Sequence, residues 1–173
     1  GSIAQSALTV ASAATLEGTG TVGDVSITGT LAPGNSVGTL TVEGDLTLGD
    51  GATYVYEVDG DQNADRVVVR GTATIEDSAV FQLDAADGIV LDRTYSMIEA
   101  GTLTGTFENL HTNYTFIDLD FNNTGDTLGM VAERNAVSMA GFAQTNNQRA
   151  VARAIDAQGS EATPYRDVLL NDD

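Results

Sequence analysis

The acidic loop at residues 59–65 carries the side chains that most resemble a metal-ligand set. Oxygen-bearing side chains stand at alternate positions of this loop: Asp59, Asp61, Asn63 and Asp65. This spacing matches the first ligands of a calcium loop. The sixth position of that pattern is Ala64 rather than glycine, and the twelfth is Arg70 rather than glutamate. We therefore interpret the loop as a solvated acidic turn without a bound metal, and calcium binding by these four residues remains the alternative.

Few other residues could support catalysis. His111 is the single histidine and could act as a general base, but the sequence has no cysteine and no Gly-x-Ser-x-Gly motif beside it. Asp84, Asp87 and Asp92 could supply the paired carboxylates of a polysaccharide-acting enzyme. They lack basic and aromatic companions, so the sequence predicts no catalytic residues, no cofactor and a protein that is not an enzyme.

Composition narrows the classes of partner. The chain has 25 acidic and 7 basic residues and a formal net charge of −18. This charge disfavours nucleic acids and anionic lipids, since both require Lys and Arg to neutralise phosphate. The sequence has 19 Gly, 2 Pro and no Trp, which is typical of short strands joined by tight turns.

The first half of the sequence contains internal repeats. Residues 22–36 match residues 37–51 at an offset of 15, so that Val25 falls on Leu40. An offset of 27 places Leu40 on Val67 and Tyr54 on Phe81 without a gap. Repeats of this length are typical of stacked coils, in which like residues form columns. The two offsets indicate an inserted loop at residues 59–65, and an ordinary β-sandwich is the alternative fold.

Within each repeat, apolar residues alternate with Thr, Ser, Asp, Glu or Gly, the pattern of a half-buried strand. Gly29, Gly44 and Gly71 fall between two such strands, where a sharp bend favours a residue without Cβ. Tyr54 and Tyr56 are interpreted as internal column residues because Phe81 and Leu83 occupy the equivalent positions.

The remainder of the sequence has a different character. Residues 115–132 predict a hairpin around the turn at 122–126. Thr145 and Gln148 form a capping box that predicts a helix, with Gly159 as its stop. Thr163-Pro164 predicts the start of a short second helix.

Four segments in order resemble the C-terminal part of autotransporter passenger domains: residues 29–48, 54–73, 95–107 and 143–152. The resemblance implies an all-β fold, a right-handed parallel β-helix (solenoid) capped by C-terminal β-hairpins and followed by a short α-helical linker. It implies coils at residues 3–85, a cap or autochaperone region at 86–135 and a linker at 136–173. It also implies type V secretion and a location at the surface of, or outside, a Gram-negative bacterium.

From this resemblance we expect a segment that templates β-helix folding and acts as a stem for an upstream effector or adhesin. Its partners would be the translocator β-barrel, upstream passenger coils and host-surface ligands, not nucleic acid. The core of the cap would comprise its apolar residues: Tyr95, Met97, Ile98, Phe107, Phe116, Ile117, Leu119 and Phe121. The alternative functions are an adhesin-type ligand-binding segment and a β-helical enzyme acting on polysaccharides.

Overall fold

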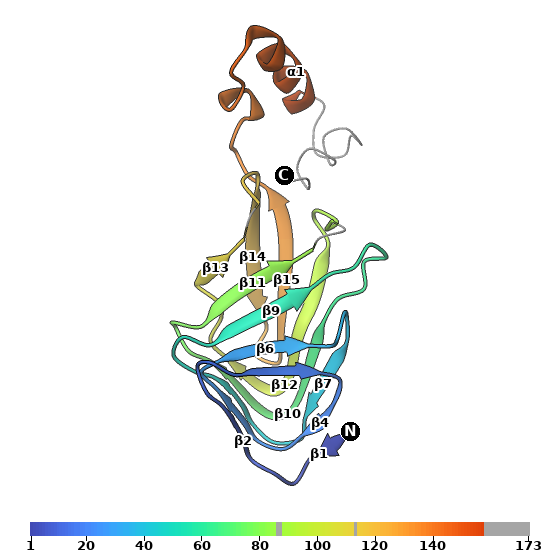
Figure 1. Cartoon of the computed structure of the whole chain (residues 1–173), viewed down its shortest axis with the longest axis vertical. Helices are drawn as coiled ribbons and strands as arrows, with labels where there is room; N and C mark the ends of the chain where they lie inside the picture. The colour runs from blue at the N-terminus through green and yellow to red at the C-terminus, as the bar shows by residue number, and fades with distance from the viewer. Residues whose placement is uncertain (86–87, 113, 158–173) are drawn as a thin grey trace. The chain divides into compact units, whose positions relative to one another are not determined.

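The computed structural model describes residues 1–85, 88–112 and 114–157 of the chain, which is built mostly of strands with one short α-helix (Figure 1). The all-β class predicted from the sequence is confirmed. Strands β1 to β13 lie in three columns of parallel neighbours, and consecutive strands among them belong to different columns. We call three consecutive strands, one from each column, a tier.

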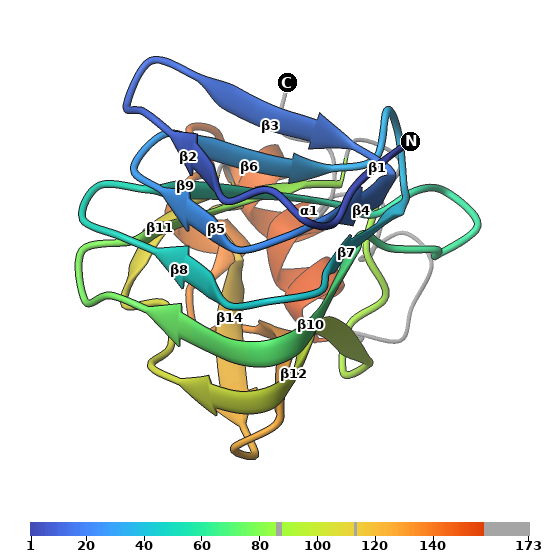
Figure 2. The same cartoon turned by 90° about the horizontal axis from the view of Figure 1, so that it is seen from below.

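In the first column the strands follow one another in the order β1, β4, β7, β10 and β12, and each pairs with its neighbours. Their bounds are β1 (Ser2–Ile3), β4 (Gly20–Val22), β7 (Thr39–Val42), β10 (Arg66–Ile75) and β12 (Thr94–Thr104). The second column pairs β2 (Leu8–Val10), β5 (Val25–Ile27), β8 (Leu46–Leu48) and the second half of β10. Figure 2 shows these strands following one another side by side.

The third column pairs β3, β6, β9, β11 and β13. Their bounds are β3 (Thr15–Gly18), β6 (Thr30–Pro33), β9 (Thr53–Glu57), β11 (Val80–Asp84) and β13 (Asn109–His111). Strands that are neighbours within these columns pair in parallel. Two parallel neighbouring strands must be joined by a long crossover connection. Here the other strands of the tier form that connection.

Like residues stack on one another inside these columns. Leu40 pairs with Val67, and Tyr54 with Phe81; all four side chains are buried. The predicted offset of 27 residues is thus confirmed as the pairing register of β7 with β10 and of β9 with β11. The offset of 15 is wrong for Val25, which pairs with Leu46 rather than aligning with Leu40, because short alternating strands match one another in more than one register.

Glycines mark places where one tier closely approaches the next. A Cβ at Gly29 would overlap the carbonyl oxygens of Ala11 and Ala14, and one at Gly44 would overlap the Asp24 carboxylate. Asp24 accepts a hydrogen bond from the Asp45 N–H at 3.0 Å. Asp45 in turn accepts one from the Thr72 N–H at 2.7 Å. The bends predicted at these glycines are therefore sites of tight tier-to-tier contact.

Aromatic rings form a continuous cluster in the core. Phe81 lies 6.1 Å from Tyr54, 5.9 Å from Tyr56, 5.5 Å from Phe107 and 5.0 Å from Phe121, measured between ring centroids. Tyr54, Tyr56 and Phe81 are fully buried. The prediction that the two tyrosines are internal column residues is confirmed.

The chain divides into two compact units, which are described separately. The first, the strand unit, comprises residues 1–89, 94–112 and 121–130 and contains the three columns. The second, the helical unit, comprises residues 90–93, 113–120 and 131–173, described here through residue 157. The boundaries predicted at residues 85 and 135 remain a prediction.

The predicted hairpin is present as β14 (Ile117–Asn123) and β15 (Thr127–Arg134), which are neighbours in the sheet. Its turn is closed by the Thr124 N–H, which donates to the Thr127 carbonyl at 3.0 Å. A 3-10 turn, η1 (Met139–Gly141), precedes the helix α1 (Asn146–Asp156).

Helix α1 begins at the predicted capping box. Thr145 accepts a hydrogen bond from the Gln148 N–H at 3.2 Å, and the Gln148 side chain accepts one from the Thr145 N–H at 2.9 Å. The predicted stop at Gly159 and the predicted second helix at Thr163-Pro164 lie outside the described residues. In the described part of the chain, no helix is both long and apolar enough to cross a membrane.

Candidate functional site

Asp65 is a buried carboxylate that fastens the inserted loop. Its side chain is 2% exposed. It accepts hydrogen bonds from the Gly38 N–H at 2.8 Å and from the Glu57 N–H at 3.1 Å. Gly38 belongs to the preceding tier and Glu57 ends β9, so this one side chain ties the end of the loop to two strand ends.

Burial raises the pKa of the Asp65 carboxyl to about 6, and the nearby Glu57 carboxylate adds to the increase. The N–H groups of Gly38 and Glu57 act in the opposite direction without cancelling it. The solvated turn predicted from the sequence is therefore wrong for Asp65. The confirmed offset of 27 residues could have indicated this contact, since it places Asp65 on Gly38.

The other end of the loop folds on itself. The Asp59 carboxylate accepts hydrogen bonds from the Asn63 N–H at 2.8 Å and from the Asn63 amide Nδ2 at 2.9 Å. The side-chain bond from Asn63 is the main reason that the pKa of Asp59 is lowered. Among the described residues no group of three or more His, Cys, Asp and Glu side chains is arranged to hold a metal ion. Asp59, Asp61 and Asp65 therefore do not form such a group, and binding of calcium by the loop stays a prediction.

Gln62 links this loop to the start of β12. Its side-chain amide nitrogen, Nε2, donates to the carbonyl oxygens of Asp59 and Gly88, each at 3.4 Å. The Tyr95 hydroxyl donates to the Gln62 Oε1 at 2.5 Å. Gln62 adopts a φ of 64°, a left-handed conformation that costs a non-glycine residue free energy. The loop thus forms a fixed connection between β9 and β12, which sequence reasoning did not identify.

Three of the four candidate catalytic residues lie in the described part of the chain. Asp84 is exposed on β11 of the strand unit, and His111 is exposed on β13. Asp92 is exposed and belongs to the helical unit. Asp87 lies outside the described residues.

The predicted cap-core residues fall into two groups. Tyr95, Met97, Ile98 and Phe107 are buried in the strand unit, where half-buried Phe121 packs against Phe81 and Phe107. The helical unit holds the other three: Ile117 and Leu119, which are buried, and Phe116, which is half-buried. Their role in folding remains a prediction.

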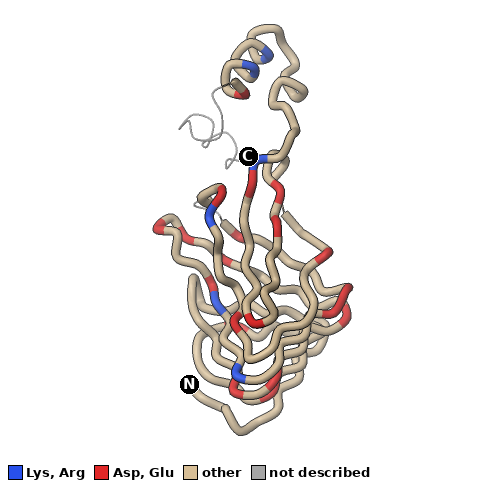
Figure 3. The backbone as a smooth tube through the Cα atoms, turned by 180° about the vertical axis from the view of Figure 1, so that it is seen from behind, with Lys and Arg blue, Asp and Glu red and all other residues tan. Residues whose placement is uncertain are grey.

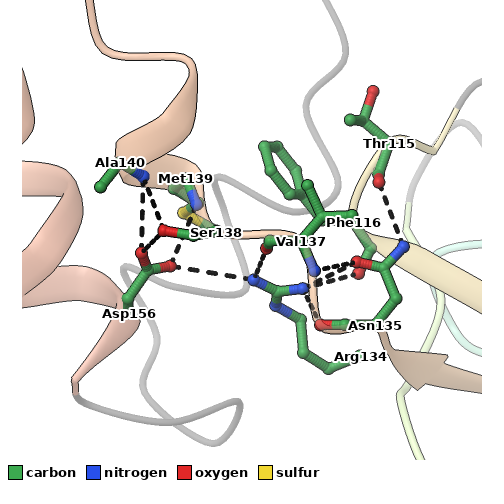
Figure 4. A network of polar contacts seen from close by, with 9 residues as sticks. All are labelled: Thr115, Phe116, Arg134, Asn135, Val137, Ser138, Met139, Ala140 and Asp156. Atoms are coloured by element: carbon green, nitrogen blue, oxygen red, sulfur yellow. Dashed lines mark hydrogen bonds and ion pairs between the residues drawn. The ribbon is translucent and has the colours of Figure 1, made fainter.

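A polar network centred on Arg134 organises the helical unit (Figure 4). The guanidinium group donates to the carbonyl oxygens of Asn135 and Val137 and lies 5.5 Å from the centroid of the Phe116 ring. Its Nη2 lies 3.8 Å from the Asp156 Oδ1. Arg134 at the end of β15 therefore reaches the last residue of α1.

Asp156 completes the network from the helix side. It accepts hydrogen bonds from the Ser138 hydroxyl at 2.8 Å, the Met139 N–H at 3.3 Å and the Ala140 N–H at 3.4 Å. Partial burial raises the pKa of Asp156, but these hydrogen bonds and the Arg134 charge outweigh burial and leave the pKa below its usual value. The ionised carboxylate thus holds η1 and α1 together.

An apolar groove runs along α1 in the same unit. It has a volume of about 530 Å³. Its lining residues are Phe116, Met139, Phe142, Ala143, Asn147, Gln148, Val151, Ala152 and Ile155. Phe142 is 61% exposed and Val151 is 59% exposed, which is unusual for large apolar side chains gathered at one place.

No protein-family model matches the chain. A curated protein described as an extracellular serine protease of Serratia marcescens is 30% identical over 153 residues. The alignment covers 82% of this chain but 15% of that protein, so the chain corresponds to a small part of its relative. The prediction of a protein that is not an enzyme is contradicted by this finding, because the relative is named as a serine protease. The prediction used the sequence of this chain alone, which aligns with 15% of the relative and not with the rest of it.

Proposed function

We propose that this chain is a right-handed parallel β-helix that serves as the folding template and stem of an exported protein of the extracellular serine protease type. The observation that carries the proposal is the stacking of buried residues at the pairing register, as in Leu40 on Val67 and Tyr54 on Phe81. Such a stack lets each tier present an apolar column and open strand edges to the next tier.

The first tier supports a role in which further tiers are added. Among the described residues, β1, β2 and β3 each pair on one side only, and Ile3 is 50% exposed. Unpaired parallel edges favour the addition of strands from the same protein. The upstream partner would be further coils of the full-length protein, which the long relative has room to supply.

The opposite end supports a role in nucleation. There the rings of Phe107 and Phe121 cover Phe81, and the Tyr95–Gln62 bond fixes the inserted loop to β12. A closed, well-packed end can form first and offer β11 and β12 as a template for earlier tiers. Each tier added buries apolar surface, and this burial contributes roughly 25 cal/mol per Å². In the proposed setting, a translocator in the outer membrane is the second partner, and the mature protein is located at the cell surface or outside the cell.

Two deletions in the full-length protein test this function in a Gram-negative host. Deleting residues 86–135 should abolish secretion of folded protein, because the covered end is lost. Deleting residues 44–70 removes one register step of 27 residues and joins Glu43 to Gly71, so it should shorten the stack and leave secretion largely intact. Protease resistance of the surface-exposed product provides the measurement. The proposal is wrong if the first deletion is secreted in a folded form, or if the second is as damaging as the first.

A further inference from the structure

The bend between the first and second columns carries a series of side-chain contacts from one tier to the next. The Asp24 carboxylate accepts a hydrogen bond from the Asp45 N–H at 3.0 Å, and the Asp45 carboxylate accepts one from the Thr72 N–H at 2.7 Å. Successive offsets in this series are 21 and 27 residues, so the same contact recurs although the tiers differ in length. Figure 3 shows acidic positions close together at bends of neighbouring tiers.

A glycine stands directly before each residue that donates one of these hydrogen bonds. Gly44 precedes Asp45, and Gly71 precedes Thr72. A Cβ at Gly44 would overlap the Asp24 carboxylate, and a Cβ at Gly71 would overlap that of Asp45. Each carboxylate therefore reaches its N–H partner through the space that the absent Cβ leaves.

The backbone completes the contact at Asp45. The Val25 N–H donates to the Asp45 carbonyl oxygen at 2.8 Å, so Asp45 is bound through both its N–H and its carbonyl group to consecutive residues of the preceding tier. Apolar pairing begins at the next residue, with Val25 on Leu46. The position of Asp45 thus fixes which residues of β8 lie opposite β5.

The apolar side chains of these strands do not fix the register by themselves. β5 and β8 pair over three residues, with buried apolar side chains at both ends. A shift of two residues keeps the same faces of both strands toward the core and would set Ile27 on Leu46 instead of Leu48. The Asp24 carboxylate would then face the side chain of Val42, whereas Gly44 leaves it space in the observed register.

We infer that Asp24 and Asp45 set the register in which one tier stacks on the next, and that Gly44 and Gly71 are the positions that admit their carboxylates. This role rests on the function proposed above, because register matters where one tier is the template for another. Both acidic side chains are exposed, so they do not contribute to the buried core. Their effect is a difference in free energy between the observed register and its neighbours.

Disulfide reporters in the full chain measure the register of β8 on β10, since the sequence contains no cysteine. Thr47 pairs with Thr74, so Thr47→Cys with Thr74→Cys should form a disulfide on oxidative refolding. Thr47→Cys with Glu76→Cys reports a shift of two residues. Strand spacing places these two Cα atoms about 8 Å apart in the observed register, whereas a disulfide requires less than about 7 Å.

Asp45→Ala should raise the yield of the shifted disulfide at least threefold relative to the unsubstituted background. Asp45→Asn should not raise it, because the amide oxygen can accept the same hydrogen bond from the Thr72 N–H. This conservative variant separates the hydrogen bond from the loss of charge. If Asp45→Ala gives no more shifted disulfide than Asp45→Asn, the inference is overturned.

A second measurement applies even if Asp45→Ala does not fold. Gly44→Ala should lower the urea midpoint of the full chain, and this shift should be at most half as large in the Asp24→Ala background, where the added Cβ has no carboxylate to displace. Equal shifts in the two backgrounds would overturn the pairing of Gly44 with Asp24 and the inference with it. Neither measurement involves secretion, so its failure is distinguishable from a failure of the two deletions that test the proposed function.

Discussion

Replacing Phe81 by alanine is the most direct test of the aromatic core. Phe81 is fully buried, and its ring lies within 6.1 Å of four others, those of Tyr54, Tyr56, Phe107 and Phe121. Loss of a buried phenylalanine side chain costs about 3–5 kcal/mol. Each aromatic pair contributes about 0.5–1.5 kcal/mol beyond area burial. Because these pairs share one ring and are not additive, we expect a loss of about 5 kcal/mol in the free energy of unfolding.

Equilibrium urea unfolding provides the assay, followed by tyrosine fluorescence and far-ultraviolet circular dichroism. The chain contains five tyrosines and no tryptophan, so fluorescence reports in part on Tyr54 and Tyr56 beside the substituted ring. The matched control is Gln82→Ala, one residue along the same strand with an exposed side chain, where a change within about 0.5 kcal/mol is expected. A loss below about 1 kcal/mol for Phe81→Ala, or an equal loss for Gln82→Ala, would refute the assignment of this cluster as the core.

Two further substitutions examine the loop and the tier contacts. The folded-state pKa of Asp65 is raised from 3.8 to about 6. The contribution of Asp65 to the free energy of unfolding is therefore fully present below pH 3.8 and is lost as the pH rises through 6. At about 1.4 kcal/mol per pKa unit, this loss is about 3 kcal/mol. The free energy of unfolding of the Asp65→Asn variant should therefore depend less steeply on pH between 4 and 7 than that of the unsubstituted chain. Parallel plots of this free energy against pH would contradict the raised pKa of Asp65. Gly29→Ala should lower the free energy of unfolding by about 1–3 kcal/mol, because the added Cβ overlaps the Ala11 and Ala14 carbonyl oxygens. The control Gly141→Ala, which has open space around its Cβ position, should change the free energy of unfolding by less than about 1 kcal/mol. Equal effects of the two substitutions would argue against close tier contact at Gly29.

The parts of the fold that the sequence predicts are those in which one signal has a single interpretation. The ungapped match that sets Tyr54 on Phe81 spans many residues, so a shift of register would place polar residues in the core. The capping box at Thr145 is likewise local and specific. Short alternating strands carry less information, and for this reason the sequence aligns Val25 with Leu40 although its partner is Leu46.

The environment of Asp65 shows why the candidate site was less predictable than the fold. Within residues 59–65, acidic and amide side chains at alternate positions suggest an exposed turn or a cation site. In the structure, the Asp59 carboxylate accepts a hydrogen bond from Asn63 of the same loop. The buried Asp65 carboxylate instead accepts one from the Gly38 N–H in another tier. That distinction depends on a contact between residues distant in sequence, which local composition does not encode.

Variation in tier length explains how a regular core and irregular loops coexist in the strand unit. Partners in the third column are Thr15 with Thr30, Thr30 with Thr53, and Thr53 with Val80, so successive offsets increase from 15 to 23 to 27 residues. The added residues lie between strands, while the buried positions Leu31, Tyr54 and Phe81 remain in register. Stacking therefore depends on alternate strand positions, and the loops can differ in length at little cost in stability. A stack built in this way can acquire a contact between tiers, such as that of Asp65 with Gly38, without disturbing the buried column.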